Sequence, residues 1–294
     1  MDKIEYYNRE TKEVCEEIVM GDGFIKWAYQ RMSGKILSPL LFKTSILTRL
    51  MGAYFNSSFS KSRIKPTIND LNIDMSDFAK SADEFTSFND FFYREIKPET
   101  RPFDKDEKTI VSPSDGRIFV YENINSESKM KVKGAEGSLE EIFNGTPPFE
   151  VDKVAVVRLC PVDYHRYHFP CDGEILSSKK VKGDYHSVNP VALAAKPKCF
   201  CVNKREYSVL QNKNAKVAIM EVGAFGVAGI YQTYQGNSVK KMDEKGYFDF
   251  GGSTVVLLFE KDTIQFSEDL IANSAKGYET LIKVGATIAE FTTQ

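Results

Sequence analysis

The stretch FGGSTVVLLFE, residues 250–260, holds the features that best predict the fold. Two glycines, Gly251 and Gly252, lead directly into Ser253, and a run of β-branched and apolar residues follows. Such a run, bounded by turn residues, is typical of a buried strand. Because glycine reaches backbone angles closed to other residues, we interpret the pair as a hairpin or bulge that enters this strand. The same bend could expose the Gly252 carbonyl to the Ser253 hydroxyl.

Three other stretches have a similar composition, and together they indicate a sheet-rich α+β protein. Residues 153–159, 174–182 and 216–222 are dense in β-branched residues and are bounded by Gly, Pro, Asn or Asp. Strands of this kind begin near residue 109 and predict a C-terminal two-thirds built on antiparallel sheets. A further short strand is expected near residues 4–7.

The N-terminal part differs, because residues 24–56 have helical periodicity. Phe42, Ile46, Leu50 and Tyr54 recur every four residues, and a glycine and a proline upstream divide the segment into two expected helices. Two interpretations are open. The helices form a subdomain packed on the main body, or they lie on a membrane surface with their apolar side chains facing lipid.

The distribution of charge bears on this choice. The chain has a net charge of −2, yet the interval 23–65 has eight basic residues and no acidic one, so the remainder carries −10. A basic block in an acidic chain points to an anionic partner, such as lipid head groups. The eight residues are Lys26, Arg31, Lys35, Lys43, Arg49, Lys61, Arg63 and Lys65.

Length and composition exclude several classes of protein. With 294 residues, 42% of them hydrophobic, the chain can bury a sizeable core. Its five cysteines are odd in number and lack C-x-x-C spacing, which argues against a disulfide framework or zinc site and favours a reducing cytoplasm. The polar N-terminus is unlike a secretory signal, and no run of about 18 apolar residues could cross a bilayer.

Two of the three histidines, His165 and His168, share the segment PVDYHRYHFPCDG, residues 161–173. Prolines near both ends disfavour a helix interior and predict a strand end or loop, where functional side chains are often displayed. The plain alternative is a pair of ordinary hydrogen-bonded histidines. Because only Asp163 stands nearby as a third ligand, we expect no metal site.

A carboxylate and a hydroxyl complete the set of candidate catalytic side chains. Asp115 lies in SPSDG, residues 112–116, where an ordinary turn residue is the plain interpretation. With a histidine and Ser253, it supplies a nucleophile, a base and a base-orienting group if the fold brings the three segments together.

In that order along the chain, SPSDG, DYHRYHFPCDG and FGGSTVVLLF resemble the signature segments of phosphatidylserine decarboxylases. FNDFFYREIKPETRPFD resembles the opening segment of the family, and VKGAEGSLEEIFNG, residues 132–145, resembles its Lys-Gly-containing strand and helix. SVNPVAL and VGAFGVAGI also match. The resemblance covers nearly the whole chain, most firmly residues 88–260.

The resemblance implies a precursor that cuts itself. His168 would be the general base on the Ser253 hydroxyl, and Asp115 would accept the other imidazole N–H and fix the tautomer. The Ser253 oxygen would attack the Gly252 carbonyl, and β-elimination would then divide the chain. The products would be a β chain, residues 1–252, and an α chain of 42 residues, 253–294.

The resemblance also implies the cofactor and the reaction of the mature enzyme. Ser253 would become a covalent pyruvoyl group, which forms a Schiff base with the amine of phosphatidylserine and accepts electrons as CO₂ leaves. Phosphatidylethanolamine is the expected product. His165 would assist decarboxylation by contacting the carboxylate or handling the proton.

The expected organisation follows from these assignments. Residues 1–85 would form an N-terminal helical, membrane-docking region, and residues 86–294 an antiparallel, sheet-rich catalytic domain. The partners would be phosphatidylserine, an anionic membrane surface, and the β and α chains of one precursor, with a homodimer left open. We expect no nucleic acid partner, and a peripheral location on the cytoplasmic side of the cell membrane.

Two departures from the family pattern stand out. The cleavage motif is commonly Leu-Gly-Ser-Thr, whereas this chain has Gly251 in the first place and keeps the scissile pair. The common Asn-Glu-Arg appears as Asn203-Lys204-Arg205, so the middle position receives no role.

The sequence leaves three rival hypotheses open. The chain could be a pyruvoyl enzyme that acts on a soluble amino acid, which a lipid-versus-soluble substrate assay would reveal. Asp115, His168 and Ser253 could form a stable hydrolase triad, which would leave one intact band on a denaturing gel. The chain could also be a non-catalytic lipid-binding module, in which Ser253→Ala would change nothing.

Overall fold

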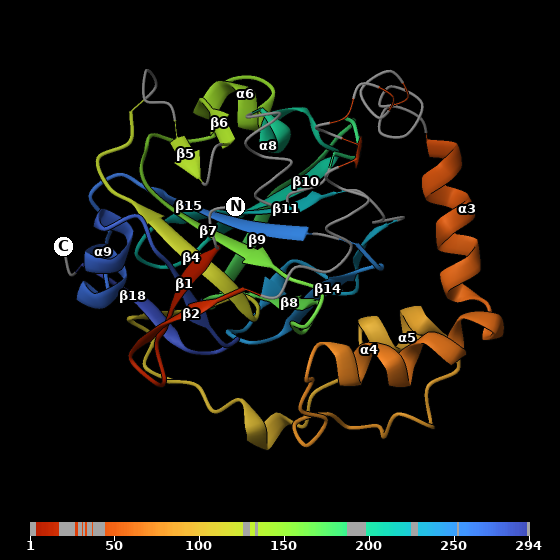
Figure 1. Ribbon diagram of the computed structural model, residues 1–294. Helices are drawn as coiled ribbons and strands as arrows, with labels where there is room; N and C mark the ends of the chain where they lie inside the picture. Colours follow the sequence, from red (N-terminus) through yellow and green to blue (C-terminus); the bar gives the residue numbers. More distant parts are fainter. Residues whose placement is uncertain are drawn as a thin grey trace.

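A ten-stranded sheet forms the centre of the molecule (Figure 1). The computed structural model describes residues 4–17, 27–28, 31, 33, 37, 45–125, 130–132, 135–186, 198–224, 229–251 and 253–292. All described neighbours in the sheet are antiparallel except one pair at its edge. The order is β13 (Ser238–Val239), β9 (Gly173–Val181), β10 (Arg205–Gln211), β11 (Lys216–Gly223), β15 (Ser253–Glu260), β7 (Val151–Leu159), β4 (Gly116–Tyr121), β17 (Glu279–Ile282), β1 (Glu5–Asn8) and β2 (Glu13–Glu16).

The four strands predicted from composition are confirmed as β15, β7, β9 and β11, and the predicted short strand near residues 4–7 is confirmed as β1. In β15, Val255 and Leu257 pack on one side of the sheet while Val256 and Leu258 pack on the other. Both faces of this strand are therefore buried, which explains why its sequence is a continuous apolar run instead of an alternating one.

Two three-stranded sheets cover the first face of the central sheet. Their apolar side chains, such as Tyr167, Phe248 and Phe266, join one core with Val255 and Leu257. One sheet is β12 (Ile230–Gln232), β14 (Glu244–Phe248) and β8 (Arg166–His168), and the other is β16 (Ile264–Phe266), β18 (Thr287–Phe291) and β3 (Thr109–Val111).

Short helices cover the opposite face and one end of the sheet (Figure 1). Leu139, Ile142 and Phe143 of α6 (Leu139–Phe143) join the second core with Val256 and Leu258. A capping box of Ser138 and Glu141 begins this helix. The same side holds α8 (Cys199–Val202) and the ribbon of β5 (Met130–Val132) and β6 (Ala135–Gly137), while α9 (Glu268–Ala275) lies against β4 and β17.

A separate aromatic core holds the helices at the other end together. Phe55, Phe85, Phe88, Phe91 and Phe92 are buried there. Figure 1 shows these helices as a group beside β8 and β14, with α3 standing along the edge of the molecule. The group comprises α3 (Ser45–Asn56), η1 (Ser58–Arg63), α4 (Ile64–Asp70) and α5 (Phe88–Phe92), with η2 (Pro98–Thr100) following.

The second helix predicted in 24–56 is present as α3, whereas most of the first lies outside the described residues. In the C-terminal half of α3, the predicted stripe does not face the core. Leu50 and Tyr54 are exposed, while Phe55 is buried and Met51 packs beside it. Because the helix is apolar on two adjoining stripes, periodicity alone could not show which one is buried.

The start of the chain is a correction to the predicted domain boundary. β1 pairs in parallel with β17, and β2 closes that edge of the sheet, so residues 5–16 are strands of the central sheet and not part of a helical region. Burial alone would raise the pKa of Glu17, but Arg158 and Arg117 outweigh it and lower that pKa to about 2. The Glu17 carboxylate accepts a 2.6 Å bond from Arg158, which fastens the hairpin to β7.

Among the helices that the structure describes, none is long and apolar enough to span a bilayer.

Candidate functional site

Ser253 begins β15 inside the molecule. It lies opposite Gly223 of β11 and Leu159 of β7, and its side chain is 0% exposed. Its Oγ has no hydrogen-bond partner among the described residues. Because side chains alternate along a strand, Ser253 faces the same side as Val255, toward the small sheet that contains β8. A buried hydroxyl without a partner is costly, and such groups mark sites where function outweighs stability.

The chain reaches Ser253 through a bend that glycine permits. Gly251 has a φ of +145°, in a region that side-chain-bearing residues rarely adopt. The departure from the family's leucine at this position therefore matches the local backbone. Gly252 lies outside the described residues, so the geometry of the Gly252–Ser253 peptide is not described.

His165 lies just before β8 with one ring nitrogen unused. Its Nδ1 is 3.0 Å from the Asp163 carbonyl oxygen, which can only accept, so Nδ1 carries the proton and Nε2 the lone pair. Nε2 is buried and has no partner among the described residues. Burial lowers the pKa of His165 to about 3, and nearby Arg94 contributes to this. The ring is therefore neutral and offers a free acceptor.

His168 ends β8 and uses both ring nitrogens. Nδ1 is 2.9 Å from the Met242 carbonyl oxygen, so it donates there, and Nε2 accepts from the Tyr164 hydroxyl at 3.0 Å. Burial lowers the pKa of His168, although Met242, Glu244 and Asp115 oppose this shift. The lone pair on Nε2 becomes available once the Tyr164 hydroxyl turns away.

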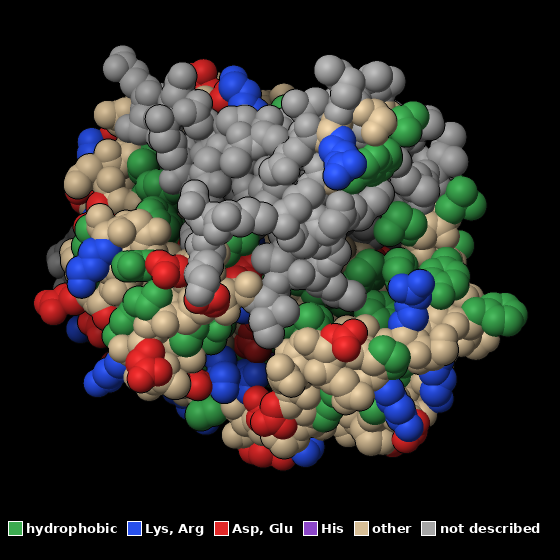
Figure 2. All heavy atoms as spheres, viewed as in Figure 1, with side chains coloured by type: hydrophobic (Ala, Val, Ile, Leu, Met, Phe, Trp, Pro, Cys, Tyr) green, Lys and Arg blue, Asp and Glu red, His purple; other side chains and the backbone are tan. Residues whose placement is uncertain are grey.

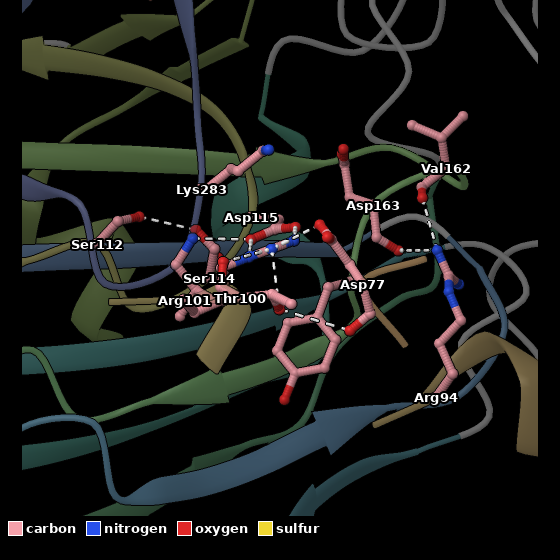
Figure 3. Close-up of polar contacts among 12 residues, drawn as sticks. Asp77, Arg94, Thr100, Arg101, Ser112, Ser114, Asp115, Val162, Asp163 and Lys283 are labelled. Atoms are coloured by element: carbon pink, nitrogen blue, oxygen red, sulfur yellow. Dashed lines mark hydrogen bonds and ion pairs between the residues drawn. The ribbon is translucent and has the colours of Figure 1, made fainter. Parts of the chain in front are cut away.

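Asp115 lies in the loop between β3 and β4, close to His168 but not bonded to it. The backbone N–H of His168 donates to the Pro113 carbonyl at 2.8 Å, so this loop and β8 are in contact. The Asp115 carboxylate instead accepts from Arg101 at 3.1 Å (Figure 3). It also accepts from the Val284 N–H at 2.7 Å. The predicted Asp115–His168 hydrogen bond is thus absent from the described structure, because Arg101 and Met242 take the two ends of it.

Phe92 brings His165 and the glycine bend to the same place. Its ring centroid is 3.8 Å from that of His165 and 5.1 Å from that of Phe250, the residue before Gly251. The segments that hold the nucleophile and the histidines therefore converge on α5. Phe92 thus links the histidine segment to the glycine bend, and the described residues show no hydrogen bond between any two of Asp115, His165, His168 and Ser253.

Sequence reasoning assigned no role to Arg94 or Tyr164, yet both hold the histidine segment. Arg94 follows α5, and its guanidinium donates to the Val162 carbonyl at 2.7 Å (Figure 3). The same guanidinium lies 4.2 Å from the Phe78 ring. Burial lowers its pKa to about 10, so it stays charged. Both residues lie inside segments that resemble the family, FNDFFYR and DYHRYH. No spacing within these segments marks either residue as functional.

The second departure from the family pattern can now be placed. Asn203 is fully buried, and its side chain bonds the backbone of His186 and the Gly223 carbonyl, next to the strand that pairs with Ser253. The middle residue, Lys204, lies near Asp249. Burial raises the pKa of Asp249 to about 6, and Lys204 acts in the opposite direction.

The donor set suits a small carbonyl group better than a metal ion. In the described part of the chain, no three His, Cys, Asp or Glu side chains gather as metal ligands. Around the unpaired Ser253 oxygen, the facing Leu159 and the Phe250 before the bend are apolar. A compact uncharged group at position 253 suits these buried, apolar surroundings.

Comparison with known proteins agrees with these observations. A sequence model described as phosphatidylserine decarboxylase matches residues 88–290. The chain is 44% identical over 290 residues to the phosphatidylserine decarboxylase proenzyme of Clostridium perfringens, covering 97% of this chain and 99% of that one. Similar proteins of the same description occur in Clostridium kluyveri, 43% identical with 97% and 98% covered, and in Fusobacterium nucleatum, 43% identical with 97% and 96% covered.

Proposed function

Since the chain belongs to the phosphatidylserine decarboxylase family, we propose that it cuts itself between Gly252 and Ser253 and then removes the carboxyl group of phosphatidylserine. The observation that carries the proposal is the Ser253 hydroxyl, which is fully buried, has no partner among the described residues and comes directly after a glycine bend. A structural serine would hold a hydrogen bond in such a place, whereas a nucleophile must keep its oxygen free.

Self-cleavage uses only atoms of the chain and water. The Ser253 Oγ attacks the Gly252 carbonyl carbon, the C–N bond breaks, and an ester replaces the peptide. A base then takes the Ser253 Cα proton, the Oγ–Cβ bond breaks, and Gly252 leaves as a carboxylate. Addition of water to the resulting dehydroalanine and loss of ammonia leave a pyruvoyl group at position 253.

The two histidines suit different steps. A general base works best when its pKa is near the working pH, and the pKa of about 3 makes His165 a weak base in the precursor. His168 keeps three groups that oppose the effect of burial, among them Asp115, so we assign His168 to the Ser253 proton. Asp115 would act through its field, while Tyr164 must release Nε2 first.

His165 becomes useful once a substrate carboxylate arrives. A negative charge beside Nε2 favours the protonated ring and raises the pKa. Nε2 can then hold the carboxylate or return a proton to the carbon that loses CO₂. The pyruvoyl group supplies the electron-withdrawing carbonyl for this reaction.

A lipid substrate requires that the enzyme reach a membrane, and the edge formed by α3 and η1 fits that need. Phe59 is 83% exposed and Leu50 is 65% exposed, and Tyr54 is also exposed. Figure 2 shows hydrophobic and basic side chains gathered at the edge where Figure 1 places α3. We propose that this edge docks on an anionic membrane surface from the cytoplasmic side.

Basic side chains flank these exposed apolar groups. The Arg63 guanidinium lies 5.8 Å from the Tyr54 ring, and Lys61 and Lys65 follow on η1 and α4. Lys65 pairs with Asp83 at 2.8 Å, a highly exposed contact that head-group phosphates can replace.

The test is a decarboxylation assay with vesicles that contain phosphatidylserine. We expect CO₂ release and phosphatidylethanolamine from the wild-type protein, none from Ser253→Ala, and slower turnover on soluble phosphoserine. Equal turnover of the lipid and the soluble compound would favour the soluble-substrate rival. Turnover that survives Ser253→Ala would overturn the proposal.

A further inference from the structure

The side chain of Asn89 connects two parts of the molecule that sequence leaves unrelated. Asn89 lies on α5 and is 0% exposed. Its Oδ1 accepts a hydrogen bond from the backbone N–H of Phe250 at 2.8 Å. Its Nδ2 donates to Oδ1 of Asn56, the last residue of α3, at 3.0 Å. One amide therefore links the end of α3 to the backbone two residues before Gly252.

The ring of Phe250 is held by the same helices. Its centroid lies 4.3 Å from that of Phe55 on α3, and 5.1 Å from those of Phe88 and Phe92 on α5. Aromatic pairs at these separations and tilts are attractive beyond the area that they bury. Phe250 is thus fixed through its backbone and its ring, although it belongs to the segment between β14 and β15.

This anchoring comes immediately before the glycine pair. Gly251 and Gly252 have no side chains to hold them, and Gly251 already has a φ of +145°. The direction in which the chain enters the glycine pair is therefore set by the fixed point at Phe250. Intramolecular attack depends steeply on alignment, and a misplacement of about 1 Å can cost about 100-fold in rate.

We propose that Asn89 is a positioning residue for self-cleavage, which holds Phe250 so that the Gly252 carbonyl meets the Ser253 hydroxyl. Asn56 orients the Asn89 amide and thereby makes the alignment depend on the position of α3. The inference rests on the proposed self-cleavage and adds that the edge proposed to dock on membranes also controls maturation.

The experiment follows cleavage of newly made precursor in a cell-free translation reaction, with the 42-residue fragment measured over time. Asn89→Leu keeps the approximate volume but removes the acceptor, and we expect cleavage to slow about 100-fold. Asn89→Asp keeps an oxygen for the Phe250 N–H, and the Asn56 amide can rotate to donate to the other oxygen. We expect this variant to cleave within about threefold of wild type.

A matched control separates positioning from a general loss of stability. Asn273 of α9 is also buried, and its Nδ2 donates to the Thr280 hydroxyl at 3.1 Å, on strands remote from the glycine bend. Asn273→Leu should lower Tm as Asn89→Leu does when both are measured with Ser253→Ala, yet leave the cleavage rate unchanged. The exposed Asn56 offers a second variant that folds readily, and Asn56→Leu should slow cleavage about three- to tenfold.

The outcomes are distinct. Slow cleavage in Asn89→Leu with recovery in Asn89→Asp supports positioning. Wild-type cleavage in Asn89→Leu, equal slowing in Asn273→Leu, or no recovery in Asn89→Asp would each refute it. A wild-type chain that never yields the fragment would instead refute the proposed self-cleavage on which the inference rests.

Discussion

The layered sheet body and the helical group α3–α5 differ in which side chains they bury and which they leave exposed. The body buries both faces of its central strands and keeps the Ser253 oxygen and the His165 Nε2 away from water. The helical group buries a set of phenylalanines, yet leaves Leu50 and Phe59 largely exposed. Under the proposed function, this difference means that the chemistry is enclosed in the sheet body while docking on other molecules is left to the helical group. Phe250 joins them.

The sharpest test of the enclosed region is the nucleophile. Ser253→Ala should abolish both cleavage and decarboxylation, because no other atom at that position can attack the preceding carbonyl. Ser253→Cys keeps a heteroatom one carbon from Cα and should still cleave, more slowly. Denaturing gels of the two variants decide this, and a cleaved Ser253→Ala chain would remove Ser253 from the mechanism.

The tandem histidines should separate into two phenotypes. His168→Ala should slow appearance of the α fragment by about 10²- to 10⁴-fold, the usual contribution of a general base. His165→Ala should cleave but decarboxylate poorly, because its Nε2 is needed only when a carboxylate is present. Gels report the first reaction and CO₂ release the second. The reverse pattern would show that the unused nitrogen of His165 is the base for cleavage.

The carboxyl group of Asp249, beside the junction of the two regions, should make stability depend on pH. Burial raises its pKa to about 6, so the folded state holds the proton more tightly than the unfolded state does. Stability from this group is present at about pH 4 and is lost as the pH rises through 6. A shift of about 2 units corresponds to about 3 kcal/mol.

In the Ser253→Ala background, Asp249→Asn should therefore gain up to about 3 kcal/mol relative to its parent as the pH rises from about 4 to 7. Urea unfolding at each pH measures this difference. Asp172→Asn is the control. Burial would raise the pKa of Asp172, but bonds from Lys241 and Lys240 lower it, so the stability from this group is already present above about pH 4, and Asp172→Asn should differ from its parent by a nearly constant amount from about pH 4 to 7. Parallel curves for both variants would contradict the assignment.

The exposed region should show the smallest effect on its own. Phe59→Ser should weaken binding to anionic vesicles about tenfold, since an exposed ring can bury its area in lipid. Leu176 of β9 is also exposed, at 55%, but lies on the sheet, and Leu176→Ser should leave vesicle binding unchanged. Co-sedimentation at two salt concentrations measures both, and binding should fall as salt rises. Equal effects of the two substitutions would remove the proposed docking edge.

The same contrast explains how much the sequence could predict. The strands β7, β11 and β15 follow from dense β-branched and apolar runs, since a strand buried on both faces leaves a local signal, whereas β9 was predicted although most of its residues are exposed. The orientation of α3 did not follow, because Leu50 and Phe55 lie on adjoining apolar stripes and tertiary packing chooses between them. That Arg158 bonds both Glu17 and Glu279 could not be foreseen either, because these partners are far apart in sequence.

The candidate site was likewise predictable only in part. Ser253, His165, His168 and Asp115 were identified from their segments, and the described contacts join the Asp115 loop to β8 and the His165 ring to α5. Their hydrogen bonds were not predictable, because the competing partners Arg101, Met242 and Tyr164 come from elsewhere or carry no spacing signal. Asn89 looked like one polar residue in a short helix, and only the contact with Phe250 gives it a role.

The central claim is that Ser253 breaks its own backbone link and becomes a pyruvoyl group. Intact-mass spectrometry of the purified, active protein tests it most directly. The account predicts two chains, with residues 253–294 lighter by one ammonia than the same peptide with an N-terminal serine, and reactive toward a carbonyl reagent. A single full-length mass in an active preparation, or an α chain that begins with unmodified serine, would contradict it.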